Sequence, residues 1–398
     1  MNCLVLTSDF PNRYEPWRGP FHRRQFQCLS ALCGVTVIEP LAWPRMVQRP
    51  ALAALPGKPE RFLDGITAYH PVFWYAPIAG RRRLWRGGLA AVRRALKLAR
   101  PAMFDVVLAT FAYPHGLMAR GLAGELGIPY AVKVRGTDLH GLPARGWRRD
   151  LTAQALEAAA AVIPVSSNLA AITRELGVPA ERIHLLPNGV DSKAFQVLAR
   201  SEARRRLHEP EDGRLLLFVG RLVPVKAVDV LLRALAQHNA AAPGRGARLV
   251  LVGEGPLRRR LEALAGKLGL AGCVRFLGQR SQEEVAMWLN AADALVLSSH
   301  NEGCPNVVLE ALSCGTPVVA SRVGAVPDLL DGSCGVTCEP GDAAALADAL
   351  GRALETDWDR AAIRARVEGM LWEKNARRLH EILCSVAAPS GTLEERRN

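Results

Sequence analysis

The chain has 398 residues, of which 49% are hydrophobic and 22% are charged. These values exclude a disordered chain and predict roughly two folded domains. The net charge of +13 is uneven, because residues 1–197 contain 25 basic and 13 acidic side chains, whereas residues 198–398 contain 26 and 25. An excess confined to the first half predicts an anionic partner there, such as membrane lipid, a phospholipid acceptor or nucleic acid.

The start of the chain, Met1 to Thr7, predicts a buried strand, since it lacks the charged, apolar and cleavage regions of a signal peptide. No run of about 18 uncharged apolar residues occurs, so no membrane-spanning helix is predicted. The nine cysteines are scattered, and none forms a Cys-x2-Cys pair. This pattern favours a reducing cytoplasm and a protein without structural zinc.

The first half alternates strand patterns with helical patterns. Strands are predicted at residues 3–7, 35–39, 106–110, 130–134, 162–165 and 184–186, and helices at residues 21–32, 117–126 and 151–160. This alternation is typical of a parallel α/β sheet. A polar, charged break at residues 195–213 follows, so we place the end of the first domain at residue 197.

The same alternation resumes in the second half, with strands predicted at residues 215–220, 249–253, 274–277, 294–298, 317–320 and 335–338. Residues 198–371 therefore predict a second domain, and the chain as a whole two Rossmann-like, doubly wound domains in tandem. The loop at Gly253 lacks the third glycine of a Gly-x-Gly-x-x-Gly motif, which argues against a dinucleotide cofactor. Residues 372–387 predict an amphipathic last helix, and residues 388–398 a flexible tail.

One turn of the second domain carries paired cations. In Gly220-Arg221-Leu222-Val223-Pro224-Val225-Lys226, Arg221 and Lys226 lie between a predicted strand and a predicted helix. Two cations beside a helix N-terminus can bind a diphosphate. Taken alone, they are more often solvated side chains beside a turn.

The stretch from Asn301 to Ala320 follows the fourth strand of the second domain. It predicts a loop, a short helix capped by Gly315 and another strand, which places the loop at the carboxyl edge of a parallel sheet, where doubly wound folds bind ligands. Glu302 and Glu310 frame this loop and helix, and the backbone N–H groups between them suit an anion and hydroxyl groups. An isolated glutamate pair is more often an ordinary loop and helix carboxylate.

The Glu-x7-Glu spacing, with Gly-Cys-Pro-Asn inside it and Glu-Ala-Leu-Ser-Cys-Gly-Thr-Pro-Val-Val-Ala after it, resembles the donor-site signature of retaining family 4 glycosyltransferases with the GT-B fold. The Gly-Arg-Leu segment ending at Lys226 resembles the diphosphate motif of that family, although Val225 and Ala227 replace its usual Glu and Gly. The resemblance implies that Glu302 contacts the donor sugar, Glu310 the ribose, and Arg221 and Lys226 the diphosphate. The implied donor-binding set also contains Gly220, Gly253, Gly303, Cys304, Pro305 and Asn306.

The resemblance also implies acceptor-side residues in the first domain. Gly19 lies in a partly matching glycine loop, where Pro20 replaces a frequent second glycine, and His115 lies in Tyr-Pro-His-Gly after a strand. His115 is included with Arg221, Lys226 and Glu302 in the predicted catalytic set, although a single histidine is more often a packed or solvated residue. Asp138 would orient the acceptor, while Arg135 stands where the family has His. The last helix is expected, by resemblance, to return to the first domain.

Residues 81–100 contain eight cations and no acid, and Trp85, Leu89, Val92 and Leu96 share one helical face. That face predicts either part of the domain core or an interfacial helix whose cations contact anionic headgroups, each contributing about 1 kcal/mol; the two can hold together. The predicted membrane-surface residues are Arg81, Arg82, Arg83, Trp85, Arg86, Arg93 and Arg94.

Eight residues of helix would separate Glu302 and Glu310 by about 12 Å, whereas the carboxyls of a retaining glycosidase lie about 5–5.5 Å apart, so we reject a hydrolase pair. The sequence instead predicts a retaining glycosyltransferase that moves a sugar from a nucleotide sugar, with a UDP-sugar favoured, to a lipid-linked or polysaccharide acceptor. We expect it to be peripheral at the inner face of the cytoplasmic membrane and to need no metal or cofactor.

Two alternatives remain open at this stage. A nucleotide-sugar 2-epimerase has a similar two-domain fold but would release a free sugar without an acceptor. A non-catalytic GT-B-like binding protein is the other, and the intact set of Arg221, Lys226, Glu302 and Glu310 argues against it. Nucleic acid is not an expected partner, because the basic stretch lacks a groove-reading motif.

Overall fold

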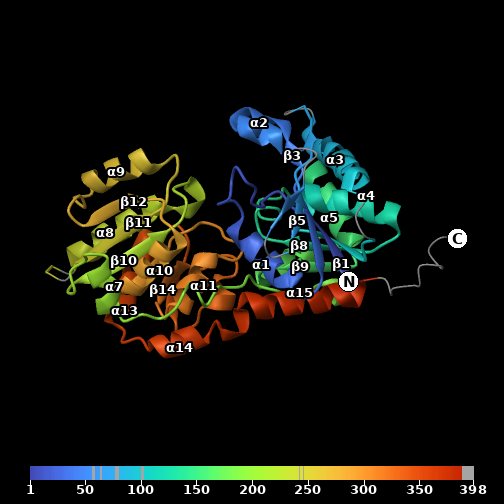
Figure 1. Cartoon of the computed structure of the whole chain (residues 1–398). Coiled ribbons are helices and arrows are strands. Elements are labelled where there is room, and N and C mark those ends of the chain that lie inside the picture. The colour runs from blue at the N-terminus through green and yellow to red at the C-terminus, as the bar shows by residue number, and fades with distance from the viewer. Residues whose placement is uncertain are drawn as a thin grey trace. The chain divides into compact units, whose positions relative to one another are not determined.

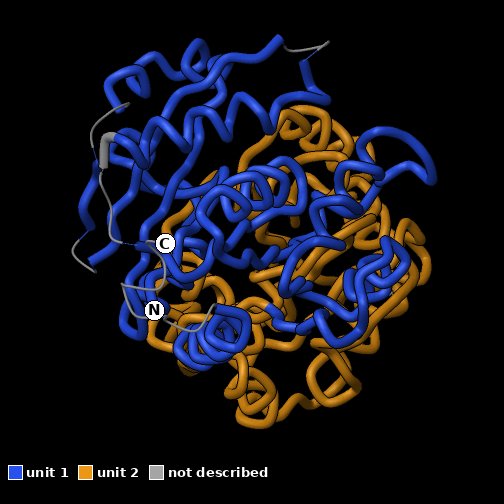
Figure 2. Tube along the Cα trace, turned by 90° about the vertical axis from the view of Figure 1, so that its right-hand side faces the viewer, with its two compact units in different colours: residues 1–187, 372–398 blue, residues 188–371 orange. Residues whose placement is uncertain are grey.

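A computed structural model describes residues 1–55, 59–62, 65–76, 80–99, 103–241, 243–244 and 246–387. The chain forms two compact units (Figure 2), the first from residues 1–187 and 372–398 and the second from residues 188–371. The predicted flexible tail, residues 388–398, and Arg100 of the basic stretch lie outside the described residues.

The first unit is built on a seven-stranded sheet in the order β4-β5-β2-β1-β7-β8-β9. All neighbours are parallel except β4 and β5, and the order from β5 to β9 is that of a Rossmann sheet. The strands are β1 (Asn2–Leu6), β2 (Gly34–Ile38), β4 (Glu60–Arg61), β5 (Thr67–Tyr69), β7 (Val106–Ala109), β8 (Tyr130–Val134) and β9 (Ala161–Pro164). A separate pair, β3 (Leu41–Ala42) and β6 (Val72–Phe73), continues beyond β2 and β5.

Five of the six strands predicted for this half are confirmed to within a residue at each end. The sixth, at residues 184–186, is wrong: His184 and Leu186 donate to the carbonyls of Val162 and Pro164 at 2.9 Å, yet the segment adds only isolated bonds to β9. The short strands β4, β5, β3 and β6 had no predicted counterpart, because two or three residues give no readable alternation.

Helices and short turns complete the first unit. They are α1 (Pro20–Ser30), α2 (Trp43–Gln48), η1 (Pro50–Ala54), η2 (Arg81–Arg83), α3 (Leu84–Ala99), η3 (Ala112–Gly116), α4 (Leu117–Leu126), α5 (Trp147–Glu157), α6 (Ser167–Glu175), η4 (Ala180–Arg182) and α15 (Trp372–Val386). Helix α15 lies beside α1 (Figure 1) and adds Ala376, Leu379, Ile382 and Leu383 to the core that contains Phe26. The last helix is therefore part of the first unit.

The second unit contains a six-stranded parallel sheet in the order β12-β11-β10-β13-β14-β15, again a Rossmann order. The strands are β10 (Arg214–Val219), β11 (Ala247–Val252), β12 (Val274–Gly278), β13 (Ala294–Leu297), β14 (Val318–Ser321) and β15 (Gly335–Cys338). The helices are α7 (Arg200–Arg206), η5 (Pro224–Lys226), α8 (Val228–Ala241), α9 (Arg258–Lys267), α10 (Gln282–Ala291), α11 (Asn306–Ser313), α12 (Val326–Leu329), α13 (Ala343–Glu355), α14 (Arg360–Ala365) and η6 (Glu368–Met370). Every strand predicted for this half is present.

The first segment of the first unit ends at Pro187, ten residues before the sequence-based boundary at 197. The intervening segment bonds within the second unit: Asn188 donates to the carbonyl of Cys304 at 3.2 Å, and Val190 to that of Met370 at 2.9 Å. The charged segment that suggested a linker is helix α7, in which buried Arg204 pairs with Asp293 at 2.8 Å. The polar composition of this segment therefore belongs to a helix that is bound to the second unit by an ion pair.

Backbone contacts fix the carboxyl edge of the second sheet. Gly220 donates to the carbonyl of Val252, and Gly253 to that of Gly278, at 2.9 and 2.8 Å. Gly253 has a φ of +136°, and a Cβ added to it would lie 1.9 Å from the carbonyl oxygen of Gly220. Only glycine allows the turns after β10 and β11 to approach this closely.

Replacing Gly253 with Ala should therefore strain the backbone and separate the two turns. We expect the substitution to cost about 2 kcal/mol or more and to lower the Tm by several degrees. The matched control is Gly266→Ala in α9, where an added Cβ meets no atom within 4 Å; this variant should keep or slightly raise the Tm. Equal Tm values for the two variants in a thermal unfolding experiment would contradict the close approach.

Candidate functional site

The turns after β10, β11 and β12 surround a cavity of about 520 Å³ in the second unit. Three predicted residues, Gly220, Arg221 and Gly253, line it together with Glu254, Gln279 and Arg280. The Arg221 side chain is exposed and has no hydrogen-bond or ion-pair partner in the part of the chain that the structure describes. The cavity thus presents an available guanidinium at the carboxyl edge of the sheet, and Gln279 and Arg280 are lining residues that the sequence did not single out.

Lys226 and Glu302, which are predicted to bind different parts of a ligand, contact each other. The Nζ of Lys226 donates to Oε1 of Glu302 at 2.5 Å, and the hydroxyl of Ser299 donates to the same oxygen at 2.6 Å. Two further bonds hold the turns together: Ser298 Oγ donates to the carbonyl of Lys226 and His300 N to that of Val225, at 2.9 and 2.8 Å. Lys226 and Glu302 meet between β10 and β13, where the strand order reverses and doubly wound sheets bind ligands.

Backbone contacts with Gly324 and Ala325 fix the loop before α11. Ala325 donates to the carbonyl of Gly303 at 2.8 Å, and a Cβ on Gly324 would lie 2.1 Å from the carbonyl oxygen of Glu302. Cys304 and Pro305 are buried. The side chain of Asn306 accepts from Asn188 Nδ2 at 2.9 Å. Pro305 precedes α11 without a side-chain cap, so the helix begins with uncapped amides beside Glu302.

Glu310 lies one turn into α11, four residues after Asn306. Its carboxyl group has no hydrogen bond or ion pair to any described residue, and burial raises its pKa to about 8. Burial also raises the pKa of the nearby Cys314 thiol to about 12. The raised pKa favours the protonated form of Glu310, and a protonated carboxyl can donate as well as accept a hydrogen bond.

The predicted acceptor-side residues lie at the carboxyl edge of the first sheet. Gly19, with a φ of +52°, precedes α1, and a Cβ on it would lie 2.4 Å from the carbonyl oxygen of Asp9. His115 lies in η3 and is buried; burial lowers its pKa to about 4, and its Nδ1 has no partner among the described residues. The imidazole is thus neutral.

The Asp138 side chain forms hydrogen bonds with the backbone. Its carboxylate accepts from the amides of Ala112, Arg135 and Gly136 at 2.9, 3.1 and 3.0 Å. Burial raises its pKa, and these amide bonds oppose that shift. Because Ala112 begins η3, Asp138 positions the turn that carries His115. Its contact with an acceptor remains a prediction.

His22 lies beside the predicted acceptor-side residues, and the sequence did not single it out. It lies three residues after Gly19, and its Nδ1–H donates to the carbonyl of Asp9 at 2.6 Å. Burial lowers the pKa of His22 well below its usual value, and its Nε2 has no partner among the described residues. Its ring lies edge-on to Phe111, which also contacts His115. The proximity of His22 to Gly19 in the sequence was the available signal.

Family comparisons agree with this geometry. A family described as Glycosyltransferase Family 4 matches residues 50–194, and one described as Glycosyl transferases group 1 matches residues 213–356. The glycosyltransferase TuaC of Bacillus subtilis (strain 168), named for teichuronic acid biosynthesis, is 30% identical over 88% of this chain and 89% of its own length. The chain belongs to the group 1, family 4 glycosyltransferases.

Another relative of the chain, the D-inositol 3-phosphate glycosyltransferase of a Nocardioides species, is 41% identical over 50% of this chain and 48% of its own length. The chain thus spans about half the length of that curated relative. Among solved structures, Anabaena HepE in complex with UDP matches with a TM-score of 0.73 and 20% identity, covering 97% of this chain and 100% of the other. The predicted family and the predicted GT-B fold of two Rossmann-like halves are confirmed.

The apolar face of α3 belongs to the domain core. Leu89 and Val92 are buried, and a Cβ on Gly88 would lie 2.0 Å from Met118 of α4. This part of the prediction for residues 81–100, a helix face that packs in the core, is confirmed, and contact of the cations with a membrane stays a prediction. Arg93 pairs with Glu125, and Arg94 donates to the carbonyl of Val72 at 3.0 Å.

The remaining predicted surface residues of α3 and η2 differ in exposure. Arg81, Arg82, Arg83 and Arg86 are exposed, and the guanidinium of Arg86 lies 5.4 Å from the ring centroid of Trp85, which is only half-buried. No helix within the described ranges is both long and apolar enough to cross a membrane. The cationic part of the predicted membrane surface is thus accessible.

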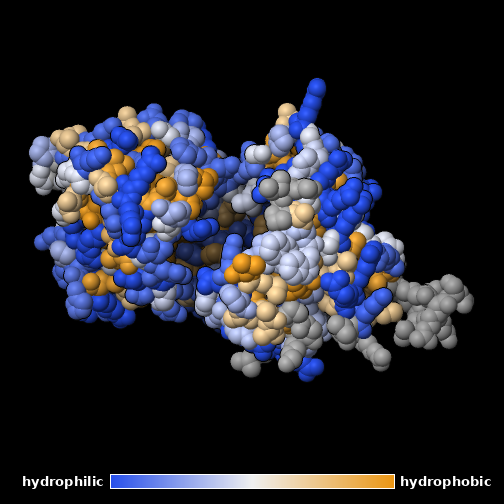
Figure 3. Space-filling view, turned by 90° about the horizontal axis from the view of Figure 1, so that it is seen from above, coloured by the Kyte–Doolittle hydropathy of each residue, from blue (hydrophilic) through white to orange (hydrophobic). Residues whose placement is uncertain are grey.

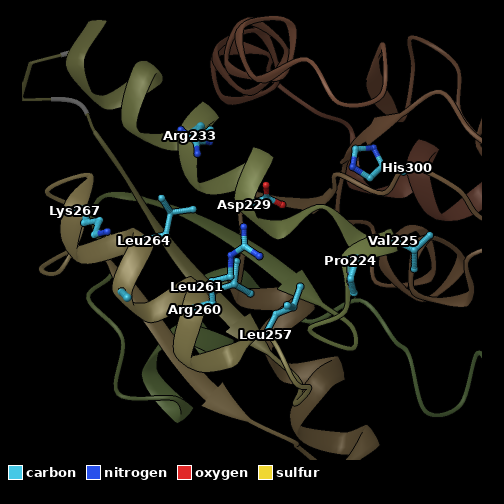
Figure 4. A pocket seen from close by; sticks show the side chains of 11 residues that line it. Pro224, Val225, Asp229, Arg233, Leu257, Arg260, Leu261, Leu264, Lys267 and His300 are labelled. Atoms are coloured by element: carbon cyan, nitrogen blue, oxygen red, sulfur yellow. The ribbon is translucent and has the colours of Figure 1, made fainter.

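A second cavity, of about 660 Å³, lies between α8 and α9 (Figure 4). Leu257, Leu261 and Leu264 line it together with Arg233, Arg260 and Lys267. On the face of the second unit that carries α9, hydrophobic patches lie among hydrophilic side chains (Figure 3). None of the predicted donor residues lines this cavity, but Pro224, Val225 and His300 from the turns that carry Lys226 and Glu302 do, so it borders the site at the carboxyl edge.

The raised pKa of Glu310 predicts a pH-dependent stability. Its folded-state pKa lies above the unfolded one, so the folded protein binds more protons and loses stability as the pH rises from about 4.5 toward 8. Glu310→Gln, which stays neutral, should raise the Tm by roughly 2–4 °C or more at pH 9 and have little effect at pH 5.

The matched control is Glu368→Gln, which changes an exposed carboxylate in the same unit. We expect it to leave the Tm unchanged at both pH values. A Glu310→Gln variant that tracks the wild-type Tm from pH 5 to pH 9 would contradict a protonated Glu310.

Proposed function

We propose that this protein is a retaining glycosyltransferase that moves a sugar from a nucleotide sugar, with a UDP-sugar favoured, to a lipid-linked or saccharide acceptor. The observation that carries the proposal is the contact of Lys226 with Glu302, shortly before the N-terminus of α11, at the point where the strand order of the second sheet reverses. Family membership and the UDP and UDP-glucose complexes of HepE, a protein of similar fold, support it.

In this proposal, Lys226 and Glu302 contact each other at the place where the donor would bind. The carboxylate of Glu302 gives Lys226 an anionic partner that the diphosphate would replace. Arg221 would bind the same diphosphate from the adjoining cavity. Glu302, once released, would accept hydrogen bonds from sugar hydroxyls, and Glu310 would contact the ribose.

The chemistry of the proposal is the one that the family resemblance implies. An acceptor hydroxyl attacks the anomeric carbon on the face from which the diphosphate leaves, the bond from that carbon to the diphosphate oxygen breaks, and the hydroxyl proton passes to the departing diphosphate. Arg221, Lys226 and the α11 amides would stabilise the negative charge that develops. Neutral His115 would lie on the acceptor side with Gly19. Independence from metal ions remains a prediction.

The basic first half supports an acceptor at an anionic membrane surface. One relative is named as a D-inositol 3-phosphate glycosyltransferase, and TuaC is named for teichuronic acid biosynthesis. The match to TuaC covers 88% of this chain against 50% for the other, so it favours a role in cell-surface polymer synthesis. We place the protein peripherally at the inner face of the cytoplasmic membrane.

Donor binding can be tested by thermal stability against a panel of nucleoside diphosphates. At a concentration about 100 times the Kd, the matching diphosphate should add about 2.7 kcal/mol and raise the Tm by roughly 5–10 °C. Lys226→Ala and Glu310→Ala should lose most of that shift, whereas Lys267→Ala, in the other cavity, should keep it. The absence of a shift with every diphosphate would remove the donor-site assignment and favour a non-catalytic binding protein.

The stereochemistry is a separate test. With the matching nucleotide sugar and a synthetic lipid-linked acceptor, the coupling constant of the anomeric proton in the product should show the same configuration as in the donor. Lys226→Ala should slow transfer by about 100-fold to 1,000-fold. An inverted product would contradict retention, and release of a free, isomerised sugar without acceptor would indicate a 2-epimerase.

A further inference from the structure

The first unit exposes an aromatic pair that the proposed donor and acceptor sites do not use. Trp74 follows β6 and is 73% exposed. Its ring stacks on that of Trp43, the first residue of α2, with 5.1 Å between centroids and 17° between planes. The Nε1–H of Trp43 donates to the carbonyl of Tyr75 at 2.7 Å, which fixes the supporting ring. The exposed indole is therefore held in place from below.

An aliphatic side chain extends this surface. Val47 lies four residues after Trp43 on α2, which places the two on one side of the helix, and it is 70% exposed. Met46 instead packs on the small core of Leu41, Leu52 and Leu55. A single exposed hydrophobic residue needs no explanation, but a continuous apolar surface on a soluble protein marks an interaction site.

The surface lies next to the arginines of η2 and α3. A Cβ on Gly87 would lie 3.1 Å from the carbonyl oxygen of Trp74, and Arg94 donates to the carbonyl of Val72, so the segment around Trp74 runs along α3. Arg83 lies one turn before Gly87, and Arg86 is its neighbour. Arg82, Arg83 and Arg86 have no carboxylate partner among the residues that the structure describes.

We propose that Trp74, stacked on Trp43 and flanked by Val47, Arg82, Arg83 and Arg86, is the surface by which this protein binds an anionic lipid bilayer. Indole rings partition to the interface between headgroups and acyl chains, and arginines beside them bind lipid phosphates. The inference rests on the proposed membrane location and assigns its apolar contact to Trp74, since the apolar face of α3 is core.

A saccharide is the other class of ligand that stacks on exposed indoles. The composition of this surface favours lipid, because Val47 is aliphatic and the neighbouring charges are guanidinium groups without carboxylates beside them in the described residues. Anionic headgroups complement those charges, and each cation near such a surface contributes about 1 kcal/mol.

The test is sedimentation of the full chain with vesicles of phosphatidylcholine alone or with about 30 mol % phosphatidylglycerol. Wild-type protein should bind the anionic vesicles. Trp74→Ser should need about tenfold more lipid for half-maximal binding, whereas Trp74→Phe should stay within about threefold of wild type. Since Trp74 is exposed, both variants should keep the wild-type Tm.

The matched control is Leu185→Ser, which removes a 45% exposed apolar side chain beside β9, at the opposite edge of the first sheet from β5. It should bind like wild type. Equal binding by wild type and Trp74→Ser would overturn this inference alone, whereas no vesicle binding by wild type would remove the proposed membrane location as well. Loss of binding to a polysaccharide gel in Trp74→Ser, with unchanged vesicle binding, would show a sugar platform and overturn the proposal.

Discussion

The ion pair between Lys226 and Glu302 joins two turns that lie 76 residues apart in the chain. It forms because β10 and β13 are neighbours in the sheet although they are not consecutive strands. The chain must reverse its direction of sheet growth at this point, which leaves a gap between crossover helices at the carboxyl edge. The cation and the carboxylate meet at that gap, and both side chains are largely shielded from solvent.

The turns around that pair are rigid because backbone packs directly on backbone. Gly253 lies against Gly220, and Gly324 lies against Glu302, at distances that exclude any side chain. The hydroxyls of Ser298 and Ser299 then bond to Lys226 and Glu302. The positions of the charged groups are thus set by main-chain contacts, while the ion pair itself is a side-chain contact that a diphosphate would replace in the proposed function.

Most of the strands could be predicted from the sequence because buried parallel strands are continuous apolar runs. Segments with a different pattern, mostly helices, separate these runs along the chain. The sequence could not show which side chains contact each other in the folded protein. Lys226 and Glu302 were assigned to different parts of a ligand, and only the fold shows that they contact each other. Asp138 was assigned to an acceptor, yet three backbone amides occupy its carboxylate.

Two surface features show the same limit. Trp43 and Trp74 are 31 residues apart and carry no motif, so their stacking could not be predicted, whereas the regular spacing of Leu89 and Val92 in α3 was visible but described the core equally well. Contacts between distant segments depend on the fold, and local periodicity cannot distinguish a buried face from a membrane-facing one.

Helix α15 makes the first unit discontinuous. Its core is completed by Ala376, Leu379, Ile382 and Leu383, which are synthesised after the entire second unit. On the ribosome, residues 1–187 must therefore wait with the surfaces of Phe26 and Leu29 uncovered while residues 188–371, a continuous segment, can fold first. The half of the protein that is translated first is the half that finishes folding last.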